Sequence, residues 1–185
     1  MFSKKLFFLF LLCIGFAGCK MYTPQQQILP EYIKKIAIRP FLNKTSQLGL
    51  EDKLYVKIYD EFLHDGRYLI TSEEEADGVL VGEITHYILQ PISYGANFEI
   101  QQYKLRILIN IYFIDKKQDV TLWSQPNLEG MTVFYVSTQP GGMTEADARE
   151  IIWENLSKKI FTRTVEGYGS VTGISNKKIP PKQVE

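Results

Sequence analysis

The stretch Ile100–Asp115 reads IQQYKLRILINIYFID, and its alternation decides the fold. Every second residue over positions 103–113 is apolar or aromatic, which is the period of a β-strand with one buried face. The alternate face carries Lys104 and Arg106 at one end and becomes apolar toward Ile114. We therefore expect one face of this strand to pack inward and the other to be at least partly open to solvent.

Other strands lie on both sides of this stretch in the chain. Residues 78–90 (GVLVGEITHYILQ) predict a second long strand, joined to the first by a wide hairpin loop over residues 91–99. Shorter strands are predicted over residues 33–41 and 67–71, and a last strand over residues 120–137 follows a turn at 116–119, with an interruption at Pro126-Asn127.

Two amphipathic helices are predicted, over residues 49–65 and from Thr144 to Gly167. Gly66 is the expected C-terminal cap of the first helix, and Thr144-x-x-Asp147 resembles a capping box at the start of the second. The apolar stripes at helical spacing are Leu50, Leu54, Tyr55, Ile58, Tyr59, Phe62 and Leu63 in the first helix, and Ala148, Ile151, Ile152, Leu156, Ile160 and Val165 in the second.

The predicted order of elements is β-α-β-β-β-β-α. Each helix is apolar along one stripe only, so both helices can cover the same face of a sheet. The sequence therefore predicts an α+β fold, a two-layer sandwich in which a mostly antiparallel or mixed sheet of four to five strands carries two helices on one face.

The N-terminus has the pattern of a targeting segment. Two lysines precede the apolar run 6–16, which is too short to span a bilayer, so residues 1–18 are predicted to be a cleaved signal peptide. The sequence FAGC at 16–19 resembles the bacterial lipobox, which implies that Cys19 becomes the diacylated N-terminus of the mature chain and anchors it. Residues 19–31 are then a lipidated tether, and Lys20 in place of aspartate implies the outer membrane.

Composition limits the function. Apolar residues make up 45% of the 185 residues and the formal net charge is zero, so we expect a globular domain without the basic field of a nucleic-acid-binding protein. Two Cys and two His are too few for a zinc site, and no metal or cofactor is expected. No nucleophile–base or phosphate-loop motif is found, and His64 and His86 are expected at the surface, so an enzyme is not expected.

Several short motifs, taken in order and spacing, resemble the lipopolysaccharide-assembly lipoprotein family LptE. They are KIAIRPF at 35–41, DGR at 65–67, EADGVLVGEIT at 75–85, QYKL at 102–105, LW at 122–123, and the helix from EADAR at 145–149 to EG at 166–167. Residues 169–185 contain lysine, proline and serine and are predicted to form an unstructured tail. The resemblance implies an α+β domain over residues 32–168. It also implies that the domain sits inside a large outer-membrane β-barrel, LptD, helps it to fold, binds lipopolysaccharide and has no catalytic residue.

The same resemblance directs attention to two basic residues. Family members carry a basic residue in the hairpin loop before the QYKL-like strand, whereas residues 93–97 here read SYGAN. The nearest basic residues are Lys104 and Arg106, on one face of the following strand, where they are candidates to meet glycolipid phosphates. The alternative interpretation is an ordinary solvated strand face.

Two other classes stay open at this point. The sequence IAIRPFLN at 36–43 also resembles a wider set of envelope lipoproteins, including activators of peptidoglycan synthases and curli-secretion subunits, which are interaction modules without a glycolipid ligand. A periplasmic hydrolase is a third class, although the chain lacks a nucleophile–base pair. Co-purification with a large β-barrel distinguishes the first class from the others.

Overall fold

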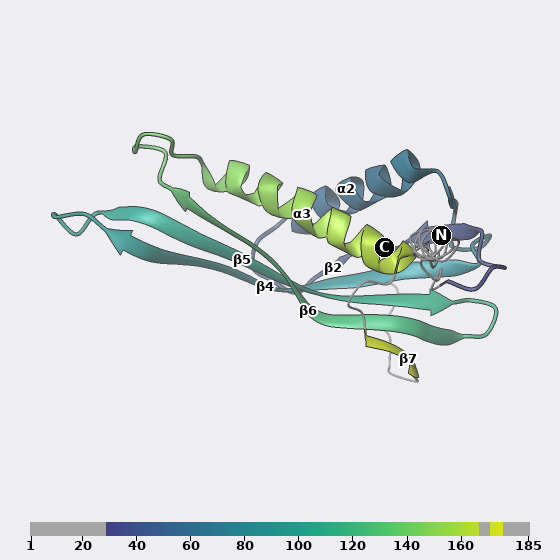
Figure 1. Ribbon diagram of the computed structural model, residues 1–185. Coiled ribbons are helices and arrows are strands. Elements are labelled where there is room, and N and C mark those ends of the chain that lie inside the picture. Colours follow the sequence, from purple (N-terminus) through teal and green to yellow (C-terminus); the bar gives the residue numbers. More distant parts are fainter. Residues whose placement is uncertain (1–28, 167–170, 176–185) are drawn as a thin grey trace, which may run out of the picture.

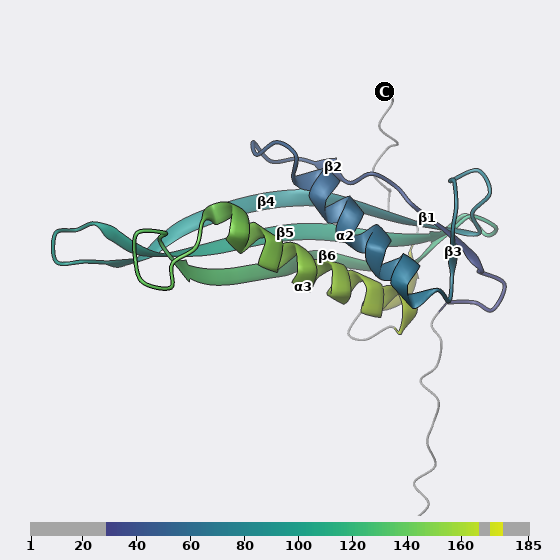
Figure 2. The same cartoon turned by 90° about the horizontal axis from the view of Figure 1, so that it is seen from above.

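The protein is a two-layer α+β structure in the computed structural model, which describes residues 29–166 and 171–175 (Figure 1). A mixed sheet forms one layer, and the two helices α2 and α3 lie on the same face of it (Figure 2). This confirms the predicted fold class. Along the chain the elements are β1 (Lys35–Ile38), β2 (Leu42–Asn43), α2 (Leu50–Asp65), β3 (Leu69–Ile70), β4 (Gly78–Tyr94), β5 (Ile100–Asp115), β6 (Val120–Tyr135), α3 (Glu145–Val165) and β7 (Val171–Ser175).

The sheet is mixed because its two sides pair differently. Its order is β3-β1-β4-β5-β6-β7, with β2 also paired to β4. The pairs that involve β1, β2 or β3 are parallel, whereas the pairs β4–β5, β5–β6 and β6–β7 are antiparallel.

The described sheet has seven strands, more than the four to five expected. The two additional strands, β2 and β7, are too short to show a clear period of two in the sequence. β7 lies within residues 169–185, for which we expected an unstructured tail. The other residues of that segment lie outside the described residues, as do the expected signal peptide and the tether up to residue 28.

The main core lies between the sheet and the helices. β5 contributes five fully buried apolar side chains to this core, as its alternation predicted, and the helices bury matching stripes against them. The strand residues are Leu105, Ile107, Ile109, Ile111 and Phe113, and the helix residues include Leu54, Ile58, Phe62, Ile152, Leu156 and Ile160. This apolar layer joins both helices to the sheet.

The helix ends follow the predicted chemistry. Gly66 closes α2 in the left-handed conformation at φ 71°, and Thr144 starts α3 with a complete capping box to Asp147. The predicted stripes need two corrections, since Leu63 is 55% exposed and Ile151 is 38% exposed. Trp153, which was not predicted in the core, is buried because α3 packs against α2 as well as against the sheet.

The predicted wide loop at 91–99 is wrong. β4 continues to Tyr94, and only residues 95–99 form the turn. Pro91 fits within the strand because β4 has no described neighbour on its outer side at this point, so no hydrogen bond is lost there. β6 is likewise continuous, and Pro126-Asn127 forms a β-bulge with Asn127 at φ 51° instead of ending the strand.

The outer half of the sheet is narrower than the rest. Pairing of β1 and β2 with β4 stops at Ile84, so residues 85–94, 100–109 and 128–135 of β4, β5 and β6 form a three-stranded extension, here termed the distal half. Figure 2 shows the β4–β5 hairpin projecting beyond both helices. At the other end, the sheet face turned away from the helices carries a second buried cluster of Ala37, Ala76, Val79, Val81, Tyr112 and Ile114.

Candidate functional site

The two basic residues predicted from the sequence lie together on the sheet face away from the helices. In register, Lys104 of β5 lies between Gln90 of β4 and Val133 of β6. Arg106, two residues further, lies between Ile88 and Met131. Both cations are therefore in the middle strand of the distal half, on the face that the helices leave open.

The two cations differ in their partners. The Arg106 guanidinium forms a salt bridge with the Glu129 carboxylate, and this hydrogen bond lowers the pKa of Glu129. The Lys104 ammonium has no hydrogen bond or salt bridge to another described residue, although its charge also acts on Glu129. Arg106 is thus held in place by Glu129, while Lys104 leaves a net positive charge at this site.

Apolar side chains of β6 lie beside these cations on the open face. Met131, Val133 and Tyr135 are each close to half exposed, at 48%, 47% and 48%. The sequence instead predicted an open face of β5 that becomes apolar toward Ile114, but this end of the strand is not exposed. Tyr112 and Ile114 are buried in the second cluster.

The sequence contained a signal for the residues of β6 that were missed. Residues 131–135 read MTVFY, in which Met131, Val133 and Tyr135 form an apolar or aromatic series on one face of the strand and Phe134 lies on the other. Phe134 takes the helix side and is buried, so its two neighbours Val133 and Tyr135 lie on the open face. The resulting surface combines cationic and apolar groups and is suited to bind a molecule that has both anionic and apolar parts.

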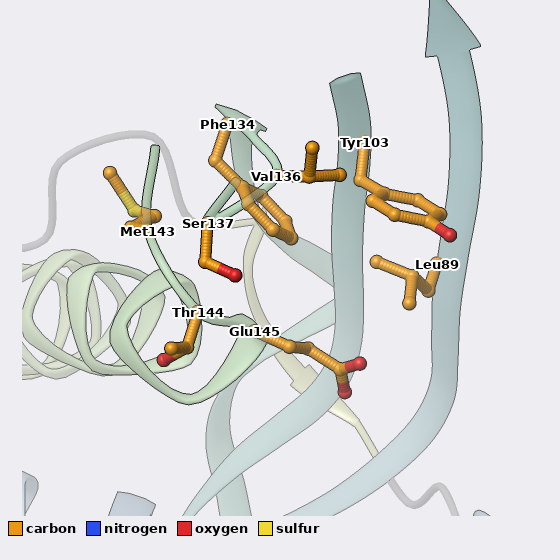
Figure 3. A pocket seen from close by; sticks show the side chains of 8 residues that line it. All are labelled: Leu89, Tyr103, Phe134, Val136, Ser137, Met143, Thr144 and Glu145. Carbon is orange, nitrogen blue, oxygen red and sulfur yellow. The ribbon is translucent and has the colours of Figure 1, made fainter. Parts of the chain in front are cut away.

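A cavity of about 270 Å³ lies on the opposite, helix-covered side of the distal half (Figure 3). The rings of Tyr103 and Phe134 stack at 5.9 Å between centroids and form one side of it, and Glu145 lies on the other side. Glu145 accepts a hydrogen bond from Tyr87, and burial together with this bond raises the pKa of the Tyr87 hydroxyl. The remaining lining residues are Leu89, Val136, Ser137, Met143 and Thr144.

This cavity does not have the groups of a hydrolase. Its described lining holds a serine hydroxyl but no histidine, lysine or cysteine that could act with it as a base or nucleophile. Thr144 already serves as the helix cap, and Glu145 is bonded to Tyr87. The polar groups of the cavity therefore take part in the structure of the helix start.

The described part of the chain shows neither a metal site nor a membrane-spanning helix. Within residues 29–166 and 171–175, no three His, Cys, Asp or Glu side chains converge as a metal site. In the acidic run at 73–75, Glu73 accepts a hydrogen bond from Arg39 with an N–O distance of 2.6 Å. None of the described helices has the length and apolar character needed to cross a bilayer. Cys19, the predicted lipid anchor, lies outside the described residues.

The chain forms a small α+β domain with helices on one face of its sheet and an open face on the other. The family model for LptE, described as lipopolysaccharide-assembly, matches residues 33–164, and the chain belongs to this family. At the level of the family it is a lipopolysaccharide-assembly lipoprotein, and the family is not an enzyme family. No curated protein matches the sequence significantly.

Solved structures share the fold at low sequence identity. The hypothetical protein CT253 from Chlamydia trachomatis is 10% identical, with a TM-score of 0.54 over 74% of this chain and 97% of that one. The protein XCC0632 from Xanthomonas campestris is 11% identical, with a TM-score of 0.50 over 74% and 88% of the two chains. At these identities the similarity is one of fold.

Proposed function

We propose that the mature chain is an anchored, non-catalytic subunit of a lipopolysaccharide translocon in the outer membrane. In this proposal, lipidated Cys19 holds the domain at the periplasmic face of the membrane, and the domain binds and supports an LptD-type β-barrel. It also binds lipopolysaccharide through Lys104 and Arg106. Membership of the LptE family is the observation that carries the proposal.

The open face of the distal half supports the glycolipid part of this role. Arg106, held by Glu129, and Lys104, without a salt-bridge partner in the described residues, present two cations 2 residues apart on one strand. Charged donors of this kind bind phosphate groups well. The exposed Met131 and Val133 beside them offer apolar contact for the acyl part of a phosphorylated glycolipid.

A charge-reversal experiment tests the glycolipid site. We expect a double variant with Lys104→Asp and Arg106→Asp to bind purified lipopolysaccharide at least about tenfold more weakly at low salt, because it loses two cations that face the phosphates. It should also lose most of the salt dependence of binding. Equilibrium binding of the purified protein to lipopolysaccharide at several salt concentrations measures both effects.

A charge-matched control separates local contacts from net charge. Lys53 and Lys158 are exposed on the helices, so the double variant with Lys53→Asp and Lys158→Asp has the same net charge with the open face intact. This control should bind lipopolysaccharide like the wild-type protein. Equal losses in the two double variants would show that Lys104 and Arg106 do not form a specific site.

Purification from detergent-solubilised envelopes tests the barrel part of the proposal. The full chain should retain a large outer-membrane β-barrel protein, and its depletion should reduce the amount of correctly folded barrel and of surface lipopolysaccharide. Intact surface lipopolysaccharide together with a block in peptidoglycan synthesis or fibre secretion would instead assign the chain to the other class of envelope lipoproteins.

A further inference from the structure

The two outer edges of the distal half are built differently. On β4, register shifts occur between Ile84 and His86 and on both sides of Ser93, and Pro91 lies between them. Bulges and proline are the devices that prevent an edge strand from pairing with another chain. This edge of the distal half is therefore protected.

The edge on β6 lacks these devices. From Leu128 to Tyr135 the strand keeps an unbroken register with β5, and this stretch contains no proline. In the described part of the chain, β7 pairs only with the segment Thr121 to Ser124, and no strand pairs with β6 beyond it. A regular, apolar and unpaired edge is a template for strand addition.

Three hydrogen bonds show which backbone groups point outward from this edge. Val136 donates its N–H to the Gln101 carbonyl of β5, at 3.0 Å, so the even-numbered residues of β6 bond inward. The carbonyls of Glu129 and Tyr135 are instead met from outside, by Lys159 Nζ and by the Met143 N–H, both at 3.1 Å.

Between these two capped carbonyls lie Met131 and Val133, the remaining odd-numbered positions. By the same alternation, each directs its N–H and C=O away from β5. Neither has a backbone partner on the outer side among the described residues. The N–H and C=O groups of these two residues thus give four backbone groups in the geometry that an added strand requires.

The side chains beside this edge indicate what kind of strand fits. On the open face Met131 and Val133 are close to half exposed, which favours apolar side chains at alternate positions of the incoming strand. Lys104 is in register with Val133 on this face, and Lys159 reaches the edge from the helix side. These two cations favour an acidic residue in the incoming strand.

We propose that the β6 edge at Met131 and Val133 binds an extended segment of the β-barrel partner by strand addition. The segment alternates apolar residues and carries acidic ones. This inference rests on the proposed function, because it names how the same partner is held. A second copy of the chain would bring the same two lysines to the edge, whereas an acidic segment complements them.

The chain's own C-terminus is a poor candidate for this edge. β7 pairs Val171 with Ser124 and Ser175 with Thr121, so it runs away from Met131. The ten residues that follow contain two adjacent prolines, which cannot donate to a ladder.

A proline substitution at Val133 tests whether an outward-pointing backbone N–H of β6 binds the partner. In Val133→Pro the lost N–H is one that points away from β5, so the sheet should keep its hydrogen bonds and the protein its thermal midpoint within a few degrees. In Val133→Thr the N–H and the β-branched shape are kept. We expect barrel retained from solubilised envelopes to fall about tenfold for Val133→Pro and less than about twofold for Val133→Thr.

A second measurement uses the unaltered backbone in case Val133→Pro fails to fold. In the purified wild-type complex, the amides of Met131 and Val133 should exchange with deuterium more slowly than in the free protein. A photoreactive phenylalanine at position 131 should cross-link to an extended segment of the barrel protein.

The outcomes separate the two proposals. Equal retention of barrel by both Val133 variants, unchanged amide exchange, or cross-links from position 131 to a second copy would overturn strand addition and leave the proposed function standing. Failure of the wild-type chain to retain any barrel would overturn the proposed function, and strand addition with it.

Discussion

At the scale of single residues, carboxylates at turns fix how the chain enters and leaves the sheet. Asp77, just before β4, accepts hydrogen bonds from the backbone N–H groups of Lys34 and Lys35 at 2.9 and 2.8 Å. Asp115, at the end of β5, is fully buried and accepts bonds from the N–H groups of Lys117 and Gln118 at 2.8 and 3.1 Å. Asp77 thereby joins the start of β4 to the start of β1, and Asp115 closes the turn after β5. Both carboxylates satisfy backbone N–H groups that strand pairing alone leaves without a partner.

Asp77 should make the stability of the protein depend on pH. Its hydrogen bonds from Lys34 and then Lys35 lower the pKa of the folded-state carboxylate. A lowered folded-state pKa contributes stability above the ordinary pKa of about 3.9, and this stability is lost as the pH falls through the lowered value. We expect Asp77→Ala to reduce the free energy of unfolding at pH 7 by about 1–2 kcal/mol, and by less below about pH 3.

Urea unfolding at several pH values measures this effect. Asp60→Ala is the control, because Asp60 is exposed on α2 and its carboxylate has no hydrogen bond to a described residue. If Asp77→Ala and Asp60→Ala lose equal stability at every pH, the contacts of Asp77 with β1 do not stabilise the fold.

At the scale of elements, the long strands, the helices and the short strands β1 and β3 were predictable from the sequence, whereas β2 and β7 were not. The alternation over β5 and the stripes of the helices repeat often enough to identify each element and its buried face. β2 has two residues and offers no repeat. For the candidate site, the alternation of β5 correctly placed Lys104 and Arg106 on the open face. That Met131 and Val133 lie beside them follows from the β5–β6 register, which a single sequence does not specify.

The two faces of β5 should respond differently to truncation. Ile109 is fully buried under the helices, so Ile109→Ala should cost about 2–5 kcal/mol through lost burial and a cavity. Lys104→Ala, on the open face, should change stability by less than about 0.5 kcal/mol. Chemical denaturation of the two variants makes the comparison, and similar losses would contradict the assignment of the faces.

At the scale of the whole molecule, the helices cover one face of the sheet and leave the distal half open on the other. The second buried cluster lies on this open side near β1, whereas Met131, Val133 and Tyr135 of the distal half are close to half exposed. Exposed apolar groups that lie together on a surface are typical of binding sites. In the proposed role, the membrane anchor at Cys19 and the binding face belong to separate parts of the chain.

Loss of the anchor should therefore release the domain without unfolding it. We expect Cys19→Ala to prevent acylation and to move the protein from the membrane fraction to the periplasmic fraction, because the acyl chains on this cysteine are the proposed anchor. Fractionation after a high-salt wash, in cells that lack the barrel partner, is the measurement. A variant that stays with the membranes under these conditions has its anchor elsewhere in the chain.

The pairing order of the strands also has a consequence for how the chain folds. Residues 95–99 and 116–119 are the short connections of the β4–β5–β6 meander, so these strands meet after closing small loops. β1 pairs with β4 only across the intervening α2, as Ala37 opposite Val79 shows. Contacts close in sequence form faster than distant ones, so we expect the meander to form early, with β1 and the helices docking onto it later. During that interval the face that becomes the core is uncovered, and a newly exported chain is then most exposed to aggregation.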